Sequence, residues 1–285
     1  MNPGLVLHLT AFGQPRRYQV RTTTAVQVGA MKFENELLYV VEQTVLGNNE
    51  RGYLLQIDVV HAIQQATDLF SRVTADLNQA TRRLVLQTDL HGQLLRVENQ
   101  PEVLRAWQAM RKAVQAKYAA EPTVRPYLDA FEQQLAVPDS MAPNLRNKGL
   151  YGALLPKVYG QAYAKEPVHS RQQISGFFHD IDLPLTVATT AQPTEETAFQ
   201  DAVQVTATAS LDAESFAATD FRRLMRSIVD DYKFPVDLTL THRANHLLAA
   251  RTGELLRSQQ QLAAEVPGVY LNRITHDVFP QPPTA

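Results

Sequence analysis

The sequence predicts an α+β fold in which two antiparallel β-rich parts flank a helical middle segment. Three observations support it: alternating β-branched runs in the first hundred residues, a helical apolar repeat in the middle, and a second series of strands after residue 166. The expected segments are a β-rich part with one helix at 1–100, the helical middle at 101–165, a second β-rich part with one helix at 166–278, and a tail at 279–285. They are compatible with one continuous domain.

The first β-rich part is expected to begin with three strands. Residues 17–28 place β-branched and aromatic side chains at alternate positions, which indicates a strand with one buried face. Two further strands are predicted at 36–46 and 53–63. The segment between them, GNNERG, is rich in Asn and Gly, which tolerate the positive φ of a hairpin turn. We therefore expect these two strands to pair.

A helix and a hairpin complete this part. Apolar residues recur every three or four positions between 68 and 83, the period of a helix with one buried stripe. The runs RLVLQT and LLRVEN then predict two short strands joined by DLHG. In that turn we expect Gly92 to take a left-handed conformation and Asp89 to accept backbone amide hydrogens. His91, at the tip, should be exposed.

The helical middle should contain three helices. Asn99, Pro101 and Glu102 favour a helix start, with Asn99 as the cap. A second helix fits 123–136, and a third fits 148–164, where a proline should break or bend it.

The second β-rich part repeats the order of strands, helix and hairpin. Strands are expected within 172–190 and 198–212, a helix within 219–232 and a hairpin within 236–251. Setting Thr88 against Thr241 places Gly92 opposite Asn245, which suggests an internal repeat. Amphipathic hairpins resemble one another for physical reasons, so chance similarity stays open as the alternative.

Composition excludes several classes of function. The chain has no cysteine, which excludes disulfides, thiolate metal sites and cysteine nucleophiles. Its formal net charge is −2 and its basic residues are scattered, so we expect no nucleic-acid partner. No apolar run approaches the ~20 residues of a membrane span. Phosphate-binding glycine motifs are absent and no cofactor is expected. The N-terminus resembles no secretory leader, so the expected location is cytoplasmic, or the cell envelope if a leader was removed.

Two polar groups are candidates for chemistry. His179, Asp180 and Asp182 could supply an acid and base pair, although on a strand His179 would face away from the two carboxylates. Exposed polar residues are the simpler interpretation. His242 and His246 have the spacing of two metal ligands on a helix, but their surroundings favour a strand, so no metal is predicted.

Aromatic residues of the helical middle are candidates for ligand binding. Tyr151, Tyr159 and Tyr163 lie among small residues that could line an apolar cavity, and Trp107 lies on the apolar face of a helix. Core packing is the commoner role for such residues.

The leading functional hypothesis is a non-catalytic binding protein for an apolar small molecule or a protein partner. The first alternative is a metal-dependent hydrolase with an Asp/His site built from Asp180, Asp182, His242 and His246. The second is a structural or assembly component that forms homo-oligomers through exposed strand edges.

Overall fold

The computed structural model describes residues 4–10, 13–65, 68–194 and 201–281. The strands are β1 (Leu5–Val6), β2 (Arg16–Val28), β3 (Met31–Asn49), β4 (Gly52–Gln64), β5 (Arg83–Thr88), β6 (Leu94–Val97), β7 (Ala162–Tyr163), β8 (Val168–Phe178), β9 (Ile181–Pro193), β10 (Ala202–Leu211), β11 (Thr239–Ala249), β12 (Leu255–Val266) and β13 (Tyr270–Pro280). The helices are α1 (Leu69–Leu77), α2 (Gln100–Lys117), α3 (Arg125–Ala136), α4 (Met141–Leu145), α5 (Gly149–Leu154) and α6 (Ala218–Val229).

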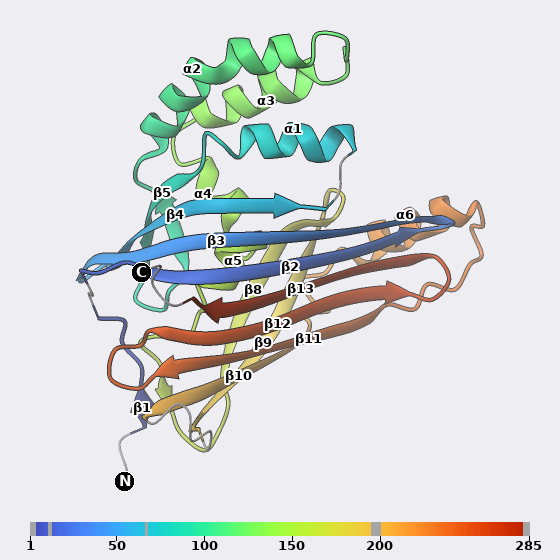
Figure 1. Ribbon diagram of the computed structural model, residues 1–285. Coiled ribbons are helices and arrows are strands. Elements are labelled where there is room, and N and C mark those ends of the chain that lie inside the picture. Colours follow the sequence, from blue (N-terminus) through green and yellow to red (C-terminus); the bar gives the residue numbers. More distant parts are fainter. Residues whose placement is uncertain (1–3, 11–12, 66–67, 195–200, 282–285) are drawn as a thin grey trace.

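The protein is mostly antiparallel β-sheet with a few helices, which is consistent with the predicted α+β class. Eleven strands form one sheet in the order β6-β5-β4-β3-β2-β13-β12-β11-β10-β9-β8, and β1 pairs separately with β7. Near the middle of the large sheet, β2 of the first β-rich part pairs with β13, the last strand, from Tyr18 with Pro280 to Val28 with Tyr270 (Figure 1). Strands from both β-rich segments therefore share one sheet.

One face of this sheet carries the helices. Val20 of β2 and Val278 of β13 are direct partners and both are fully buried, whereas the next pair, Arg21 and Asp277, points to the opposite face. We call the face of Val20 and Val278 the covered face. The alternation that predicted the strands is thus the alternation between this face and solvent.

Two hydrophobic cores lie on the covered face. The first joins β2 to β5 with α1 to α5 and includes Trp107. The second surrounds Phe178 and includes Phe221 and Met225 of α6. The rings of Phe178 and Phe221 lie 4.7 Å apart. Because the cores form at different places along the sheet, the space between them is available for a site.

The sheet curls around the segment that links α4 to α5. Arg146 Nε donates to the carbonyl of Leu94 on edge strand β6 at 2.9 Å. The next residue, Asn147, donates through Nδ2 to the carbonyl of Gln173 on the other edge strand, β8, at 3.1 Å. Two consecutive residues thus bridge both edges, and we call this region the seam. α5 continues from the seam and packs on β2, β12 and β13.

The predicted turn at DLHG is confirmed. Asp89 Oδ1 accepts from the backbone N–H groups of His91 at 2.9 Å and Gln93 at 2.8 Å, and His91 is exposed. Gly92 has a φ of 92°. A Cβ at Gly92 would lie 2.7 Å from the Pro156 carbonyl oxygen, so both the turn and its packing require glycine.

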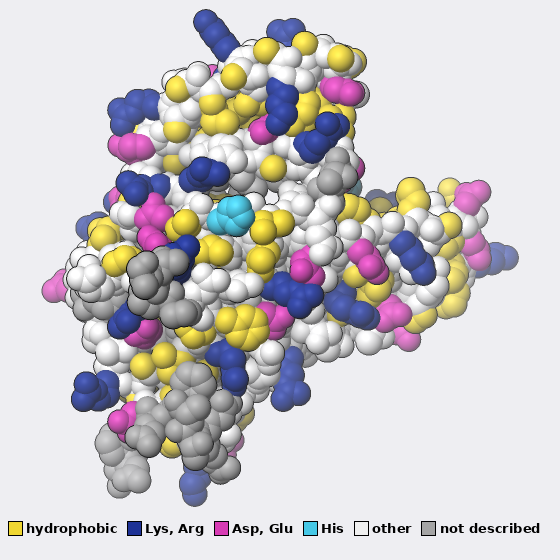
Figure 2. Space-filling view, in the orientation of Figure 1, with side chains coloured by type: hydrophobic (Ala, Val, Ile, Leu, Met, Phe, Trp, Pro, Cys, Tyr) yellow, Lys and Arg dark blue, Asp and Glu magenta, His cyan; other side chains and the backbone are white. Residues whose placement is uncertain are grey.

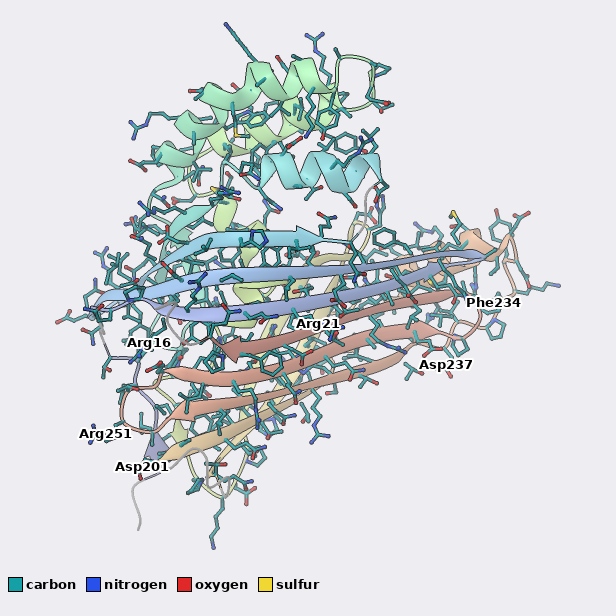
Figure 3. All side chains as sticks on the ribbon, viewed as in Figure 1. Arg16, Arg21, Asp201, Phe234, Asp237 and Arg251 are labelled. Atoms are coloured by element: carbon teal, nitrogen blue, oxygen red, sulfur yellow. The ribbon has the colours of Figure 1, made fainter. Side chains whose placement is uncertain are left out.

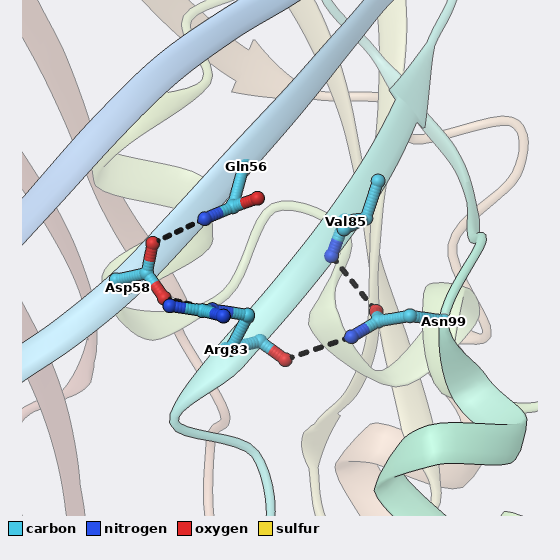
Figure 4. Close-up of polar contacts among 5 residues, drawn as sticks. All are labelled: Gln56, Asp58, Arg83, Val85 and Asn99. Carbon is cyan, nitrogen blue, oxygen red and sulfur yellow. Dashed lines mark hydrogen bonds and ion pairs between the residues drawn. The ribbon is translucent and has the colours of Figure 1, made fainter. Parts of the chain in front are cut away.

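Asn99 is the N-cap residue of α2 as predicted, but its side chain forms no capping hydrogen bond. Asn99 precedes α2, but its side chain extends the sheet instead: Oδ1 accepts from the Val85 N–H at 2.8 Å and Nδ2 donates to the Arg83 carbonyl at 3.0 Å (Figure 4). Arg83 in turn pairs with Asp58 of β4. These bonds connect the start of α2 to β5. The residues next to Asn99 in the sequence give no indication of partners that lie 14 and 16 positions earlier.

The hairpin predicted at 236–251 is displaced. Thr239 to Ala249 form one continuous strand, and the chain turns later, between β11 and β12. Figure 3 shows Arg251 of this turn at the end of the sheet where Asp201 lies, and Phe234 and Asp237 at the opposite end. Asn245 pairs with Thr206 in mid-strand, so the proposed match with the turn residue Gly92 does not support an internal repeat.

The predicted tail begins within a strand. Phe279 and Pro280 belong to β13, and 282–285 lie outside the described residues. No helix in the described segments has the length and apolar character needed to cross a membrane. On the face seen in Figure 2, cationic and anionic side chains are interspersed, so neither sign of charge dominates it.

Candidate ligand cavity

A cavity of about 340 Å³ lies on the covered face, beneath α5 and the segment that follows it. Its lining includes residues from every strand between β8 and β13 in the sheet order. Strands lie about 4.8 Å apart, so these six would spread over about 24 Å in a flat sheet. Because the sheet is curved, residues from all six strands can line the same cavity.

The cavity lies where the two hydrophobic cores do not meet. Phe177 and Ile174 of the second core line one part, and Val158 of the first core lines another. Ala207 and Ala244, direct partners on β10 and β11, form part of the floor. Two paired alanines leave room that larger side chains would fill.

Three histidines face this space. His242 and His246 lie on β11 and His276 on β13. Nδ1 of His246 lies 2.9 Å from Ser258 Oγ, and Nδ1 of His276 lies 2.9 Å from Thr22 Oγ1. Burial lowers the pKa of His246 and of His276 to about 4, and it lowers the pKa of His242. All three are therefore neutral at pH 7.

Two polar atoms of the lining residues lack partners. Nδ1 of His242 and Oδ1 of Asn272 are buried with no hydrogen-bond partner among the described residues. Leu262 of β12 pairs with both His242 and Ile274, so His242 and Asn272 lie two strands apart. An unpaired buried polar atom costs about 1–3 kcal/mol, so a water or a ligand group that pairs with either atom is stabilised there.

The floor is fixed to α5 by one amide. Gln260 Nε2 donates to the Ala153 carbonyl of α5 at 3.0 Å and to Ser258 Oγ at 3.1 Å. The bond to Ala153 thus fixes α5, on one side of the cavity, to β12, on the other.

The candidate catalytic residues lie elsewhere. His179 and Asp180 are exposed at the turn between β8 and β9, where His179 has a φ of 64°. Asp182 accepts from the Gly176 N–H at 2.7 Å and from the Gln173 side chain. All three line an exposed hollow beside α6, so the structure brings them to one region of the surface. Asp182 alternates with the core residue Leu183 and so lies on the face opposite the cavity.

The candidate metal ligands do meet at one site. His242 and His246 lie on the same face of β11 and both line the cavity. No carboxylate joins them, because Asp180 and Asp182 are outside the cavity lining. Within the described segments, no group of three or more His, Asp or Glu side chains is placed to hold a metal ion.

Three of the four aromatic candidates are core residues. Trp107 is fully buried between α2 and α3, with its ring 5.3 Å from that of Phe131. Tyr159 donates its hydroxyl to the Gly253 carbonyl at 3.0 Å, and Tyr163 donates to the Val158 carbonyl at 2.8 Å. These contacts anchor the segment after α5.

Tyr151 lines a second cavity on the other side of α5. This space, also about 340 Å³, lies between β3 and β4 on one side and α1, α3, α4 and α5 on the other. Tyr39 and Phe131 contribute to it, and burial raises the pKa of Tyr151. Lys148 and Gly149 line both cavities, so the start of α5 separates them.

Sequence reasoning missed His276, Asn272 and the alanine pair. A signal for the first two is present, because Asn272, Ile274 and His276 alternate on one face of a strand in the company of apolar residues. The alanine pair depends on strand register and has no local signal. The sequence matches no protein-family model and no curated protein.

Proposed function

We propose that the protein is a non-catalytic binding protein for an apolar small molecule held between the covered face and α5. The observation that carries this proposal is the cavity of about 340 Å³, whose lining combines apolar side chains such as Val187 and Ile274 with neutral polar ones such as His242 and Asn272. Lys148 and Lys157 add two charged side chains to the lining. Ligand pockets in proteins span about 300–1,000 Å³ and combine apolar lining with a few orienting polar atoms. His242 Nδ1 and Asn272 Oδ1 are available for that orientation.

We also infer that the two β-rich parts, 1–100 and 166–278, form the two halves of one curved sheet, and that the helical middle, 101–165, packs over it. The pairing of β2 with β13 supports this division, as does the packing of α5 on β2, β12 and β13. A ligand beneath α5 would then contact the second half and the helical middle together.

The chemistry of the lining favours binding over hydrolysis. Among the described residues that line the cavity there is no Asp or Glu, so a carboxylate acid or base is not available to a ligand there. The hydrolase alternative needs Asp182 beside His242, and the two lie on opposite faces of the sheet. The assembly alternative needs free strand edges, and part of each edge is taken up at the seam, where the Leu94 and Gln173 carbonyls accept side-chain hydrogen bonds.

The test fills the cavity. Ala207→Phe places a ring in the floor, and Thr208→Phe places the same ring one residue later on the exposed face as a matched control. We expect wild type and Thr208→Phe to bind the neutral fluorescent probe N-phenyl-1-naphthylamine, and Ala207→Phe to lose at least about tenfold in affinity. Near-ultraviolet circular dichroism checks that both variants fold.

Two outcomes would contradict the proposal: no probe binding to wild type, or equal affinity of the folded Ala207→Phe variant. Native mass spectrometry of gently purified protein gives an independent readout, because a retained organic mass that the Ala207→Phe variant lacks would support the cavity as the site.

A further inference from the structure

Cationic side chains gather at the seam, outside the cavity. A hollow of about 260 Å³ lies between the two edges of the sheet, and Arg146, Lys157 and Arg171 all line it. No Asp or Glu belongs to its described lining. The hollow therefore has a positive wall with no acidic residue within it.

This hollow adjoins the ligand cavity. Four residues line both spaces: Asn147, Lys157, Gln172 and Ser175. A molecule that extends from the cavity past Lys157 would enter the hollow, so the two spaces form a polar end and a largely apolar end of one site.

The charges at the seam are only partly neutralised by the protein. Arg146 uses Nε for the Leu94 carbonyl, and neither Arg146 nor Lys157 forms an ion pair with a described residue. Arg171 Nε lies 3.7 Å from Asp212 Oδ2. The negative charge of Asp89 partly offsets the positive charge of Lys157 without a direct contact. Burial and the charge of Arg146 lower the pKa of Lys157 to about 8. An anion in the hollow would stabilise the charged lysine.

We propose that the ligand is an anionic amphiphile whose acidic head group binds Arg146, Lys157 and Arg171 at the seam while its apolar chain occupies the cavity. This inference rests on the proposed function. Guanidinium and ammonium groups bind a carboxylate and a phosphate monoester alike, so the two head groups share the chemistry that the seam recognises.

The experiment compares head groups on one chain. Decanoate, decyl phosphate, decanol and decyltrimethylammonium are titrated against protein with bound N-phenyl-1-naphthylamine, below their micellar concentrations. We expect at least one of the two anions to displace the probe at least about tenfold more tightly than decanol, and the cation to be the weakest. The anion that binds tighter identifies a carboxylate or a phosphate as the preferred head group.

Charge variants locate the head group. Arg171→Gln should reduce the affinity for the preferred anion and leave decanol unchanged, because Arg171 lines the hollow and not the cavity. Lys157→Gln should reduce the affinity for the preferred anion about tenfold and change that for decanol much less, because Lys157 lines both spaces. Lys165→Gln is the matched control, because Lys165 is exposed and lines neither space. Added salt should weaken the anions and not decanol.

The outcomes separate the two proposals. Equal affinity for decanol and both anions, or unchanged anion affinity in Lys157→Gln, overturns the anionic head group while the cavity proposal stands. Failure of the probe to bind wild type overturns the cavity itself, and the head-group inference with it.

Discussion

His246 should make the fold sensitive to acid. Burial, with a smaller effect of His242, lowers its pKa from 6.5 to about 4, so the unfolded chain binds a proton that the folded protein does not. Stability from this residue is complete above pH 6.5 and is lost as the pH falls from 6.5 through 4. The shift of about 2.5 pH units corresponds to about 3.5 kcal/mol at most, at about 1.4 kcal/mol per unit.

His246→Asn removes the titration and keeps an amide that can bond Ser258 Oγ. We expect the stability advantage of wild type over this variant to shrink by up to about 3 kcal/mol between pH 7 and pH 4. His276, with a similar shift, is present in both proteins and cancels in the difference.

Urea denaturation at a series of pH values measures the free energy of unfolding of wild type and variant. His169→Asn is the control, because His169 is exposed on β8, and its curve should run parallel to that of wild type. If His246→Asn also runs parallel to wild type across this range, His246 titrates normally in the folded state and the burial argument is refuted.

Three further perturbations test other parts of the structure. Lys157 has its pKa lowered to about 8 by burial, so wild type should gain stability as the pH rises from 8 towards 10.5, and Lys157→Met should lose that gain in urea titrations. Trp107→Ala should lower the free energy of unfolding by about 3–5 kcal/mol, yet leave probe affinity unchanged, because Trp107 packs between α2 and α3 away from the cavity. Gly92→Ala should cost about 1–3 kcal/mol in thermal or urea unfolding, whereas Gly13→Ala, with no atom within 4 Å of the added carbon, should cost less.

Short sequence patterns predicted the structure correctly where the hydrogen bonds of a segment form between residues close together in the chain. The turn at Asp89 closes with bonds to His91 and Gln93, two and four residues away, so its residue types predict it. Asn99 and Asn245 misled for the opposite reason. The side chain of Asn99 bonds to β5 and not to the first turn of its own helix, and Asn245 lies within a strand that is paired on both sides.

The candidate site was predicted only in part. His242 and His246 stood out by spacing and do line the cavity, but among the described residues no carboxylate or third metal ligand joins them. The sequence identified Asp182 as a possible catalytic carboxylate. It did not indicate that Asp182 would accept hydrogen bonds from Gly176 and Gln173.

The sequence by itself determined the local elements: the period of its apolar residues decided which segments form strands and helices, and its lack of cysteine excluded thiolate chemistry. The tertiary structure decided the site. Pairing of β2 with β13 joins the first and second β-rich parts in one sheet, and strand register sets Ala207 beside Ala244 and His242 two strands from Asn272. These relations depend on packing between distant segments, and the cavity exists only where the curl of the sheet brings those segments together.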